Sequence, residues 1–319
     1  MAANPPSMTD RPADDLLSRI LELYQLRASV FATPNTCGAW QLDMPATRNV
    51  EFHLVASGRG FLHLGLAEGA PIELQAGDVV VFPRSRRHIV SHAATIEEPG
   101  TRLFEAGTGP RAELVCGTFN LDGAQANPLI VSLADVVIVT GTSAREELKA
   151  LALLLASEAR LPRSARQSVL DRLSEVLFVY VLRHELERGS IRSGLLSAFL
   201  DPTLRRALAA MHESPGTHWT IASLAGVAHL SRTAFLDRFQ SAVGTPPMQF
   251  LTDWRMRLAH LRLRDGSRSV AAVASELGYS TEAAFRRAFK RVLGVGPGAV
   301  RRQGLASDVP EPHQPVAGG

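Results

Sequence analysis

The spacing of hydrophobic residues changes twice along this chain of 319 residues. After a polar segment at residues 1–13, residues 14–26 show the spacing of a short amphipathic helix. Over residues 28–121 apolar and polar residues alternate in short runs, which is typical of strands. From residue 143 onward the helical spacing returns. The pattern therefore predicts an α+β chain of two domains, with a sheet-rich first part and a helical second part.

The strand-forming runs lie between turns rich in Gly, Pro and Asn. We predict strands at residues 28–33, 39–43, 50–56, 60–66, 72–75, 78–82, 88–92, 112–121 and 136–139. Ser57-Gly58 is interpreted as the turn between the third and fourth of them. Many short strands at this spacing favour a β-sandwich or a small barrel.

Two longer helices are predicted after the strands. Ser143 and Glu146 match a capping box, which opens a helix over residues 143–160. A second helix over residues 162–188 has apolar positions at a three-four spacing, which fits either a seam with a second copy of the chain or packing on its own barrel. These positions are Val169, Leu170, Leu173, Val176, Leu177, Tyr180, Val181 and His184.

Two similar units lie in tandem near the C-terminus, at residues 219–244 and 269–294. Each has a short Ala-rich helix, a tight turn, a second helix with two phenylalanines four residues apart, and a final glycine suited to a C-cap. This is the pattern of a helix-turn-helix. Two solvated amphipathic hairpins are the alternative, and the tandem repetition disfavours it.

The second helix of each unit has a polar face opposite its phenylalanines, at about 100° of rotation per residue. Such a face fits the major groove of double-stranded DNA, where side chains reach base edges. We therefore expect DNA contacts from Arg232, Thr233, Leu236, Asp237 and Gln240 in the first unit, and from Ala283, Arg286, Arg287, Lys290 and Arg291 in the second.

A helix at residues 247–264 joins the two units. Its apolar stripe is predicted to be Phe250, Leu251, Trp254, Leu258 and Leu261, with Arg255, Arg257, Arg262 and Arg264 largely off it. Asp265-Gly266 is expected to stop the helix. At about 1.5 Å per residue its length of roughly 27 Å would hold two reading helices about one DNA turn apart.

Residues 201–302 resemble the DNA-binding domain of AraC-type transcription regulators. The resemblance rests on GYSTEAAFRRAFKRVLGVGPGAVRR at 278–302, and on LSRTAFLDRF and DWRMRLAHLRL before it. It implies a sequence-specific regulator of transcription, with RNA polymerase as a further partner. Asp237 departs from the basic or amide residue of many relatives: it would accept a hydrogen bond from a cytosine amine, or only orient Arg238.

The stretch GDVVVFPRSRRH at 77–88 resembles the second cupin motif, and Glu51 matches the end of the first. This implies a cupin-like jelly roll as the N-terminal sensor domain. Glu51, His53 and His88 would make a three-ligand metal site, or else the polar lining of a ligand cavity. The histidine pair that completes a cupin site is absent near Met44 and Ala46. We therefore expect no cofactor and no enzyme, and keep a cupin-type metal enzyme as the remote alternative.

Two cysteines suggest a signal. Cys37 lies in an apparent loop and Cys116 in a predicted strand. The segments TCGAWQLD, FHLV, GDVVVFPRSRRHIVSH and LVCGTFNLD resemble the sensor of AraC-type regulators that respond to reactive chlorine. The resemblance implies oxidation of both thiols as the input. In the alternative, Cys116 is a small buried hydrophobe, Cys37 is incidental, and the effector is a small molecule.

Charge supports the division of the chain. The net charge is only +3, yet the pI is about 9.2, and arginine is concentrated in the C-terminal part. The expected organisation is a sensor at 14–142, a helical segment that is a candidate for dimerisation at 143–189, a linker at 190–200 and the DNA-binding domain at 201–302. The ends, 1–13 and 303–319, are expected to be disordered. Without an apolar leader or span, a cytoplasmic protein is expected, with no membrane partner.

Overall fold

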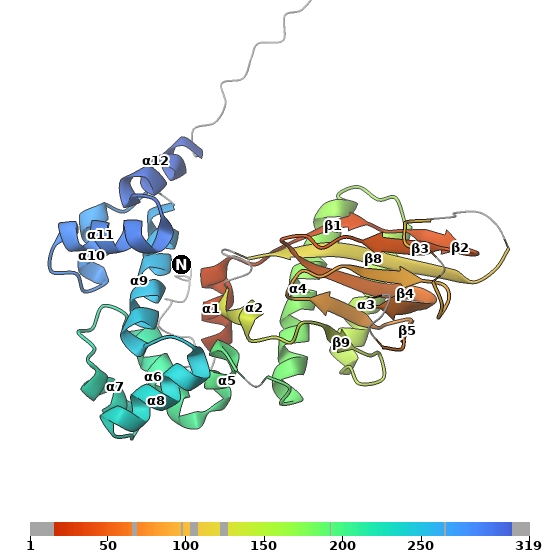
Figure 1. The fold of residues 1–319 in the computed structure, drawn as a ribbon. Helices are drawn as coiled ribbons and strands as arrows, with labels where there is room; N and C mark the ends of the chain where they lie inside the picture. Colours follow the sequence, from red (N-terminus) through yellow and green to blue (C-terminus); the bar gives the residue numbers. More distant parts are fainter. Residues whose placement is uncertain are drawn as a thin grey trace, which may run out of the picture. The chain divides into compact units, whose positions relative to one another are not determined.

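The computed structural model describes residues 16–65, 69–96, 98–102, 108–121, 127–191, 193–264 and 266–307. The chain divides into two compact units, Tyr24–Ser197 and a second made of Ala198 onward together with residues up to Leu23 (Figure 1). Most of helix α1 (Leu16–Tyr24) therefore belongs to the second unit. The predicted tail at 1–13, the predicted stop at Asp265 and residues 308–319 lie outside the described residues.

The first unit is built on one antiparallel sheet system, which confirms the predicted sheet-rich fold. Its main path has the strand order β1-β8-β4-β6-β9, and β3, β5 and β7 are joined to it through β4. The strands are β1 (Arg27–Ala32), β2 (Asn35–Cys37), β3 (Gln41–Met44), β4 (Val50–His63), β5 (Ile72–Gln75), β6 (Val79–Phe82), β7 (His88–Ser91), β8 (Arg111–Asn120) and β9 (Val137–Val139). Strand β2 and the short helix α2 (Pro128–Val131) were not predicted.

The predicted turn at Ser57-Gly58 is wrong, because β4 continues through it. The register of β4 against β8 shifts between Val55 and Ser57, which marks a β-bulge. Gly58 has φ +76°, and a Cβ there would lie 1.9 Å from the carbonyl oxygen of Arg111. The glycine thus permits the bulge. Before the bulge β4 pairs with β6, and after the bulge it pairs with β5 and β7. Strand β4 therefore belongs to two groups of strands, and these two groups are the two parts of the barrel.

Apolar side chains from both parts fill the barrel. The core cluster consists of Trp40, Leu42, Val55, Leu62, Leu74, Val80, Phe82, Val90, Ala112, Leu114 and Cys116. Asp78 is one of the buried polar residues of the barrel: its carboxylate accepts hydrogen bonds from the amides of Gln75 at 2.8 Å and Gly141 at 2.7 Å. It thereby closes the turn before β6.

Helix α4 (Arg166–Glu187) completes the edge of the sheet at β1. The amide of Val30 donates to Asp171 Oδ1 at 2.8 Å, and Gln167 Nε2 donates to the carbonyl of Val30 at 2.8 Å. Two side chains therefore satisfy the backbone amide and carbonyl of Val30 on the free side of β1. Helix α4 is fixed on the barrel by these bonds as well as by its apolar face.

The apolar positions predicted as one seam on α4 divide into two sets. Leu170, Leu177 and Val181 are completely buried, whereas Val169 and Val176 are 38% and 43% exposed. The buried set packs within the chain, so only the exposed set is left for a second copy.

The capping box predicted at Ser143 is also wrong. Helix α3 (Glu146–Arg160) begins with Arg145 as its N-cap and has no side-chain cap. Ser143 instead hydrogen-bonds back to the carbonyl of Thr140 at 3.1 Å, so it closes the preceding turn.

The second unit is helical and confirms the two predicted helix-turn-helix motifs. It contains α6 (Pro202–Glu213), α7 (Ile221–Val227), α8 (Arg232–Val243), α9 (Pro247–Arg264), α10 (Val270–Glu276), α11 (Glu282–Leu293) and α12 (Pro297–Ser307), after the short α5 (Leu195–Leu200). Ser231 and Thr281 cap the two reading helices. Gly244 and Gly294 end them in the left-handed region, as expected for C-caps. Helix α12 extends to Ser307, so the disorder predicted from residue 303 is wrong for residues 303–307.

The apolar surface of α9 differs from the predicted single stripe. Leu258 and Leu261 are only half-buried, whereas Met256, Ala259 and Leu263 are completely buried. The physical reason is that α9 serves two cores. At its start Phe250 contacts Phe239 of the first motif, with ring centroids 5.7 Å apart. At its end, Met256, Ala259 and Leu263 join Phe285 and Phe289 of the second.

The division of the α4 seam predicts opposite outcomes for two adjacent substitutions. Leu177→Glu places a carboxylate on the buried face of α4 and should lower the free energy of unfolding by more than about 3 kcal/mol. Val176→Glu, the matched control on the exposed side, should change it by no more than about 0.5 kcal/mol. Denaturant unfolding of the two variants checks this, and equal destabilisation of both would contradict the assignment of the buried face.

Candidate nucleic-acid interface and sensor core

Helix α8 presents the polar face that the sequence predicts. Phe235 and Phe239 are completely buried, and the residues between them turn outward. Leu236 is half-buried, and the exposed residues are Arg232, Thr233, Asp237 and Gln240. The first candidate reading face is therefore polar, with a single cation at its N-terminal end.

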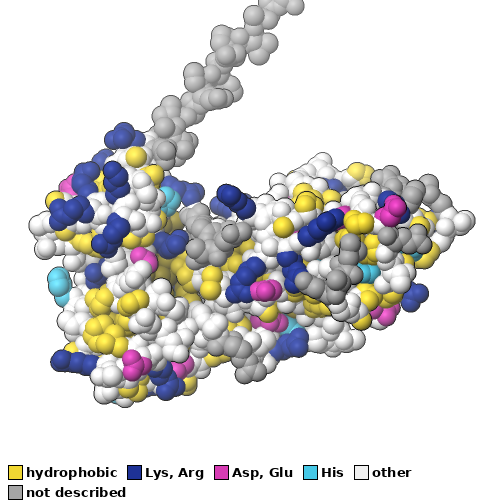
Figure 2. Space-filling view, viewed as in Figure 1, with side chains coloured by type: hydrophobic (Ala, Val, Ile, Leu, Met, Phe, Trp, Pro, Cys, Tyr) yellow, Lys and Arg dark blue, Asp and Glu magenta, His cyan; other side chains and the backbone are white. Residues whose placement is uncertain are grey.

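Helix α11 presents a more basic face. Phe285 and Phe289 are completely buried, while Ala283, Arg286, Arg287, Lys290 and Arg291 are exposed. Figure 2 shows Lys and Arg side chains gathered over α10–α12. On the same face, fewer Lys and Arg side chains lie over α7 and α8. The two reading helices thus differ in charge although they share one architecture.

The cations of α11 are not equally free. Arg286 Nε donates to Glu282 Oε1 at 2.6 Å, one turn earlier on the same helix. Arg287 and Lys290 make no hydrogen bond or ion pair with any residue of the described ranges. These two side chains can therefore meet an anion without breaking an internal contact.

Asp237 does not orient Arg238, which was one of its two predicted roles. Arg238 Nε instead donates to Asp201 Oδ2 at 2.5 Å, and Asp201 caps α6 by accepting from the amides of Thr203 and Leu204. Burial opposes ionisation of Asp201, but these three donors together hold the pKa of its carboxyl below the ordinary value. Asp237 is left exposed with its carboxylate available to a partner.

Arginines of α9 and of the following turn form hydrogen bonds and ion pairs within the helical unit. Arg255 donates to the carbonyls of Pro215 at 2.6 Å and Thr217 at 2.8 Å, and its guanidinium lies 5.9 Å from the ring centroid of Tyr279. Arg262 and Arg268 both pair with Glu276. Much of the arginine in this part of the sequence is therefore structural.

The comparisons with known proteins agree with this geometry. A family model described as a cupin matches residues 15–187, and one described as a helix-turn-helix domain matches residues 224–303. A putative AraC-like transcription regulator of Streptomyces lividans is 33% identical over 301 residues, covering 90% of this chain and 98% of its own. The chain belongs to the AraC-like transcription regulators. The predicted fold class and the predicted function, a regulator with a cupin-like domain and a DNA-binding helix-turn-helix domain, are confirmed.

Two further relatives of this AraC-like regulator are informative by name. The RCS-specific HTH-type transcriptional activator RclR of Escherichia coli K12 is 27% identical over 292 residues, covering 91% of this chain and 98% of its own. The DNA-binding domain of AdpA, crystallised with a target DNA, is 34% identical and covers 32% of this chain and 92% of its own, with a TM-score of 0.30. None of the helices described for the present chain is long and apolar enough to span a membrane.

The three predicted metal ligands do not form a three-ligand site. His53 and His88 are buried and face each other, with their Nε2 atoms 2.7 Å apart. Glu51 Oε1 accepts from Thr47 Oγ1 at 2.7 Å instead of joining them. Within the described residues, no three His, Cys, Asp or Glu side chains are grouped to hold a metal ion. The two imidazoles bond directly to each other, which leaves neither Nε2 lone pair for a metal.

The hydrogen bonds also fix the tautomers of this pair. His88 Nδ1 lies 3.0 Å from the carbonyl oxygen of Arg86, which only accepts, so Nδ1 carries the proton. His88 Nε2 is then the acceptor and His53 Nε2 the donor. Burial lowers the pKa of His53 to about 3 and that of His88 to about 4, so both rings are neutral. His53 Nδ1 is left as a buried acceptor without a partner.

The two cysteines of this AraC-like regulator are far from each other along strand β8. Cys37 ends β2, where it pairs with Arg111, rather than lying in the predicted loop. Cys116 lies five positions further along β8 and pairs with His53. At about 3.3 Å per residue the two Cα atoms are roughly 16 Å apart, which exceeds the limit of about 7 Å for a disulfide. This conformation therefore excludes a direct Cys37–Cys116 bond.

Cys116 also has the environment of an unreactive thiol. It is completely buried, and burial, followed by the charge of Glu51, raises its pKa to about 12. A thiol that stays protonated at neutral pH is a poor nucleophile. Cys37 is also buried, at 3% exposure.

His212, on α6 just before the first motif, is a buried ring that the sequence did not indicate as functional. His212 stacks on Trp254 at 3.6 Å between centroids, and neither of its ring nitrogens has a hydrogen-bond partner. Burial first, and the charge of Arg19 second, lower its pKa to about 3. The spacing of apolar residues in α6 could have shown that His212 is buried, because His212 lies on the same side of the helix as Leu208 and Met211.

His212 should make the DNA-binding unit sensitive to acid. The unfolded chain binds a proton near pH 6.5, whereas the folded ring stays neutral down to about pH 3. The free energy of unfolding should therefore fall by about 1.4 kcal/mol per pH unit as the pH drops below 6.5. His212→Phe should flatten this dependence in thermal unfolding measured from pH 7 to pH 4. The control is the same substitution at the exposed His218, and equal slopes in both variants would contradict the role of His212.

Proposed function

We propose that this regulator gains most of its DNA affinity from α11 and reads sequence with both reading helices. The observation that carries the proposal is the pair of exposed cations, Arg287 and Lys290, that have no internal partner among the described residues. Guanine edges and phosphates both favour such cations. The match of residues 224–303 to a helix-turn-helix domain supports double-stranded DNA as the ligand.

The first reading helix has a different role in this proposal. Thr233 and Gln240 supply neutral hydrogen-bonding groups, and Asp237 supplies an exposed acceptor. A carboxylate near DNA is repelled by phosphates unless it meets a donor such as the cytosine amine. Asp237 would therefore act mainly by rejecting sites that lack cytosine at one position.

Assembly and transcription partners belong to the same proposal. The exposed apolar residues of α3 and α4 include Leu153, Leu154, Val169 and Val176, with Leu153 at 71% exposure. This surface suits a homodimer, in which two linked DNA-binding domains gain affinity from effective concentration. RNA polymerase is the partner expected of a regulator that acts at a promoter. The Val176→Glu variant, which should stay folded, would sediment as a monomer.

The DNA proposal is tested by Arg287→Ala. Binding to the specific site should weaken by about 1–3 kcal/mol, and discrimination at one base position should relax. The control is Arg268→Ala, which removes the same charge from an arginine paired with Glu276. Fluorescence anisotropy with specific and scrambled DNA measures both effects. Loss of affinity in both variants alike, or no loss in either, would remove Arg287 from the reading face.

We further propose an oxidant as one signal, on the likeness to a relative whose name says that it is RCS-specific. Cys37 would react first, because it ends a three-residue strand, whereas Cys116 lies between β4 and β1 in the interior of the sheet. Its oxidation to a sulfenic acid would place a polar group in a buried position and loosen β2.

The thiol proposal predicts different behaviour for the two cysteines. In a reporter assay under hypochlorous acid, Cys37→Ser should abolish induction, while Cys116→Ser should retain most of it. After a brief treatment of the purified protein with hypochlorous acid, mass spectrometry should find Cys37 modified before Cys116. Equal induction of the wild type and the double variant would end the thiol proposal and leave a small-molecule effector.

A further inference from the structure

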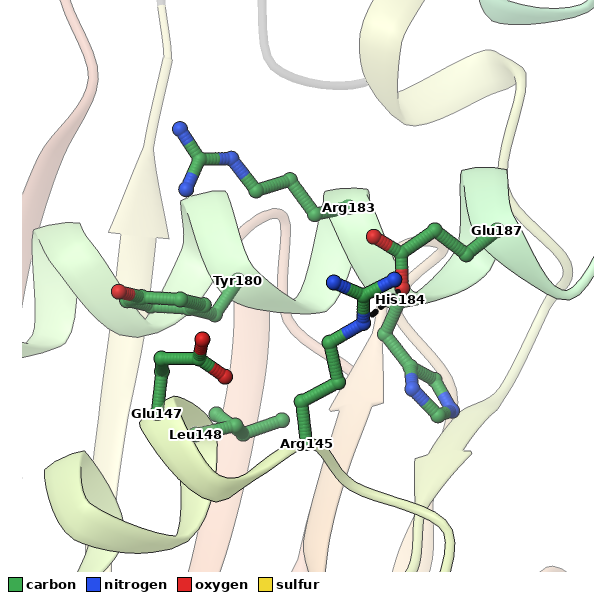
Figure 3. A pocket seen from close by; sticks show the side chains of 7 residues that line it. All are labelled: Arg145, Glu147, Leu148, Tyr180, Arg183, His184 and Glu187. Atoms are coloured by element: carbon green, nitrogen blue, oxygen red, sulfur yellow. Dashed lines mark ion pairs between the residues drawn. The ribbon is translucent and has the colours of Figure 1, made fainter.

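The first unit contains a pocket of about 300 Å³ between the start of α3 and the last turns of α4. Figure 3 shows Leu148 and Tyr180 on one side of Arg145, and His184 and Glu187 on the other. The volume is at the lower end of the range found for small-molecule sites. The pocket lies outside the barrel interior, where the cupin resemblance places a ligand.

The positive groups of the pocket come from two elements. Arg145 is the N-cap residue of α3, and its guanidinium is the positive group at this end of the pocket; Glu146 and Glu147 in the first turn already offset the partial positive charge of the helix N-terminus. Arg183 contributes a second guanidinium, which lies 5.5 Å from the centroid of the Tyr180 ring. Guanidinium groups form strong, charge-assisted hydrogen bonds with carboxylates, so an anion is favoured beside them.

One carboxylate already occupies part of this space. Glu187 Oε2 lies 2.8 Å from Arg145 Nε, and their side chains are 43% and 68% exposed. Such an exposed ion pair is weak and readily exchanged. Glu147 also lines the pocket, so its two Glu and two Arg side chains balance. An incoming anion would therefore replace Glu187 on Arg145 rather than add to it.

The remaining walls select the body of the ligand. Tyr180 offers a ring face and Leu148 an apolar surface, which together suit a flat aromatic group. His184 is 7% exposed, and its buried Nε2 has no hydrogen-bond partner. A buried polar atom without a partner is costly, so a ligand that supplies one is favoured.

We propose that this pocket binds a small aromatic carboxylic acid, whose carboxylate displaces Glu187 from Arg145 and whose ring packs on Tyr180 and Leu148. As the effector site of the regulator, the pocket rests on the function proposed above. Glu187 is the last residue of α4 and directly precedes the segment that leads to the DNA-binding domain. Its release from Arg145 is the event that would report occupancy to that segment.

The binding step is tested on the full-length protein by calorimetric titration with benzoate and phenylacetate, with benzamide as the neutral analogue and benzylamine as the cationic one. The acids should bind at one site per chain, and benzamide about tenfold more weakly. Arg145→Gln should weaken the acids by about tenfold, whereas Arg172→Gln, a control on α4 outside the pocket, should leave them unchanged.

The direction in which Glu187→Gln changes the affinity for the acids decides whether Glu187 competes with the ligand. Removing the internal competitor should tighten acid binding by about two- to fivefold, since the exposed pair it breaks is weak. The proposal would be overturned by any of three results: the protein prefers benzylamine, Glu187→Gln binds the acids more weakly, or the folded protein binds none of the probes. Specific DNA binding is measured separately by anisotropy. A protein that binds its DNA site but no acid overturns only the pocket, and one that binds the acid but no specific DNA overturns only the proposed function.

Discussion

The DNA-binding unit depends on the sharing of one helix between two cores. Neither helix-turn-helix has enough apolar surface to form a stable core alone, because each contributes two short helices. Helix α9 supplies the missing surface to both, with Phe250 at one end and Met256, Ala259 and Leu263 at the other. Since both reading helices pack on the same rigid element, the spacing between them is fixed by the length and rotation of α9. The arginines of α9 strengthen this arrangement through backbone carbonyls and Glu276.

The outward face of each reading helix follows from the same packing. Two phenylalanines four residues apart commit one side of the helix to the core and leave the other to solvent. This is why the exposure of Thr233, Asp237, Arg287 and Lys290 could be predicted from the sequence. What the sequence could not show is which cations are already paired. Arg286 and Arg287 are adjacent and chemically identical, yet only Arg286 meets a carboxylate on the preceding turn.

The sensor was predicted correctly as a sheet-rich cupin domain but less well in detail. Strand periodicity identified most strands, because alternation is a local property of the chain. The bulge at Gly58 was mistaken for a turn, since a glycine with positive φ serves both and only the partner strands distinguish them. The metal and thiol predictions depended on distances across the sheet. The closure of the barrel brings the side chains of His53 and His88 together, and the register of β2 on β8 separates Cys37 from Cys116.

The hydrogen bonds from α4 to β1 have a consequence for how this protein behaves when crowded. A free strand edge is a template for pairing with other chains, and sheet proteins that leave one open are prone to aggregate. Here Gln167 and Asp171 occupy the backbone groups of Val30 at one end of the main sheet path, and β9 at the other end is only three residues long. Neither end offers a long run of unpaired amides and carbonyls. The barrel can therefore be held close to other copies, as on neighbouring DNA sites, with little tendency to associate edge to edge.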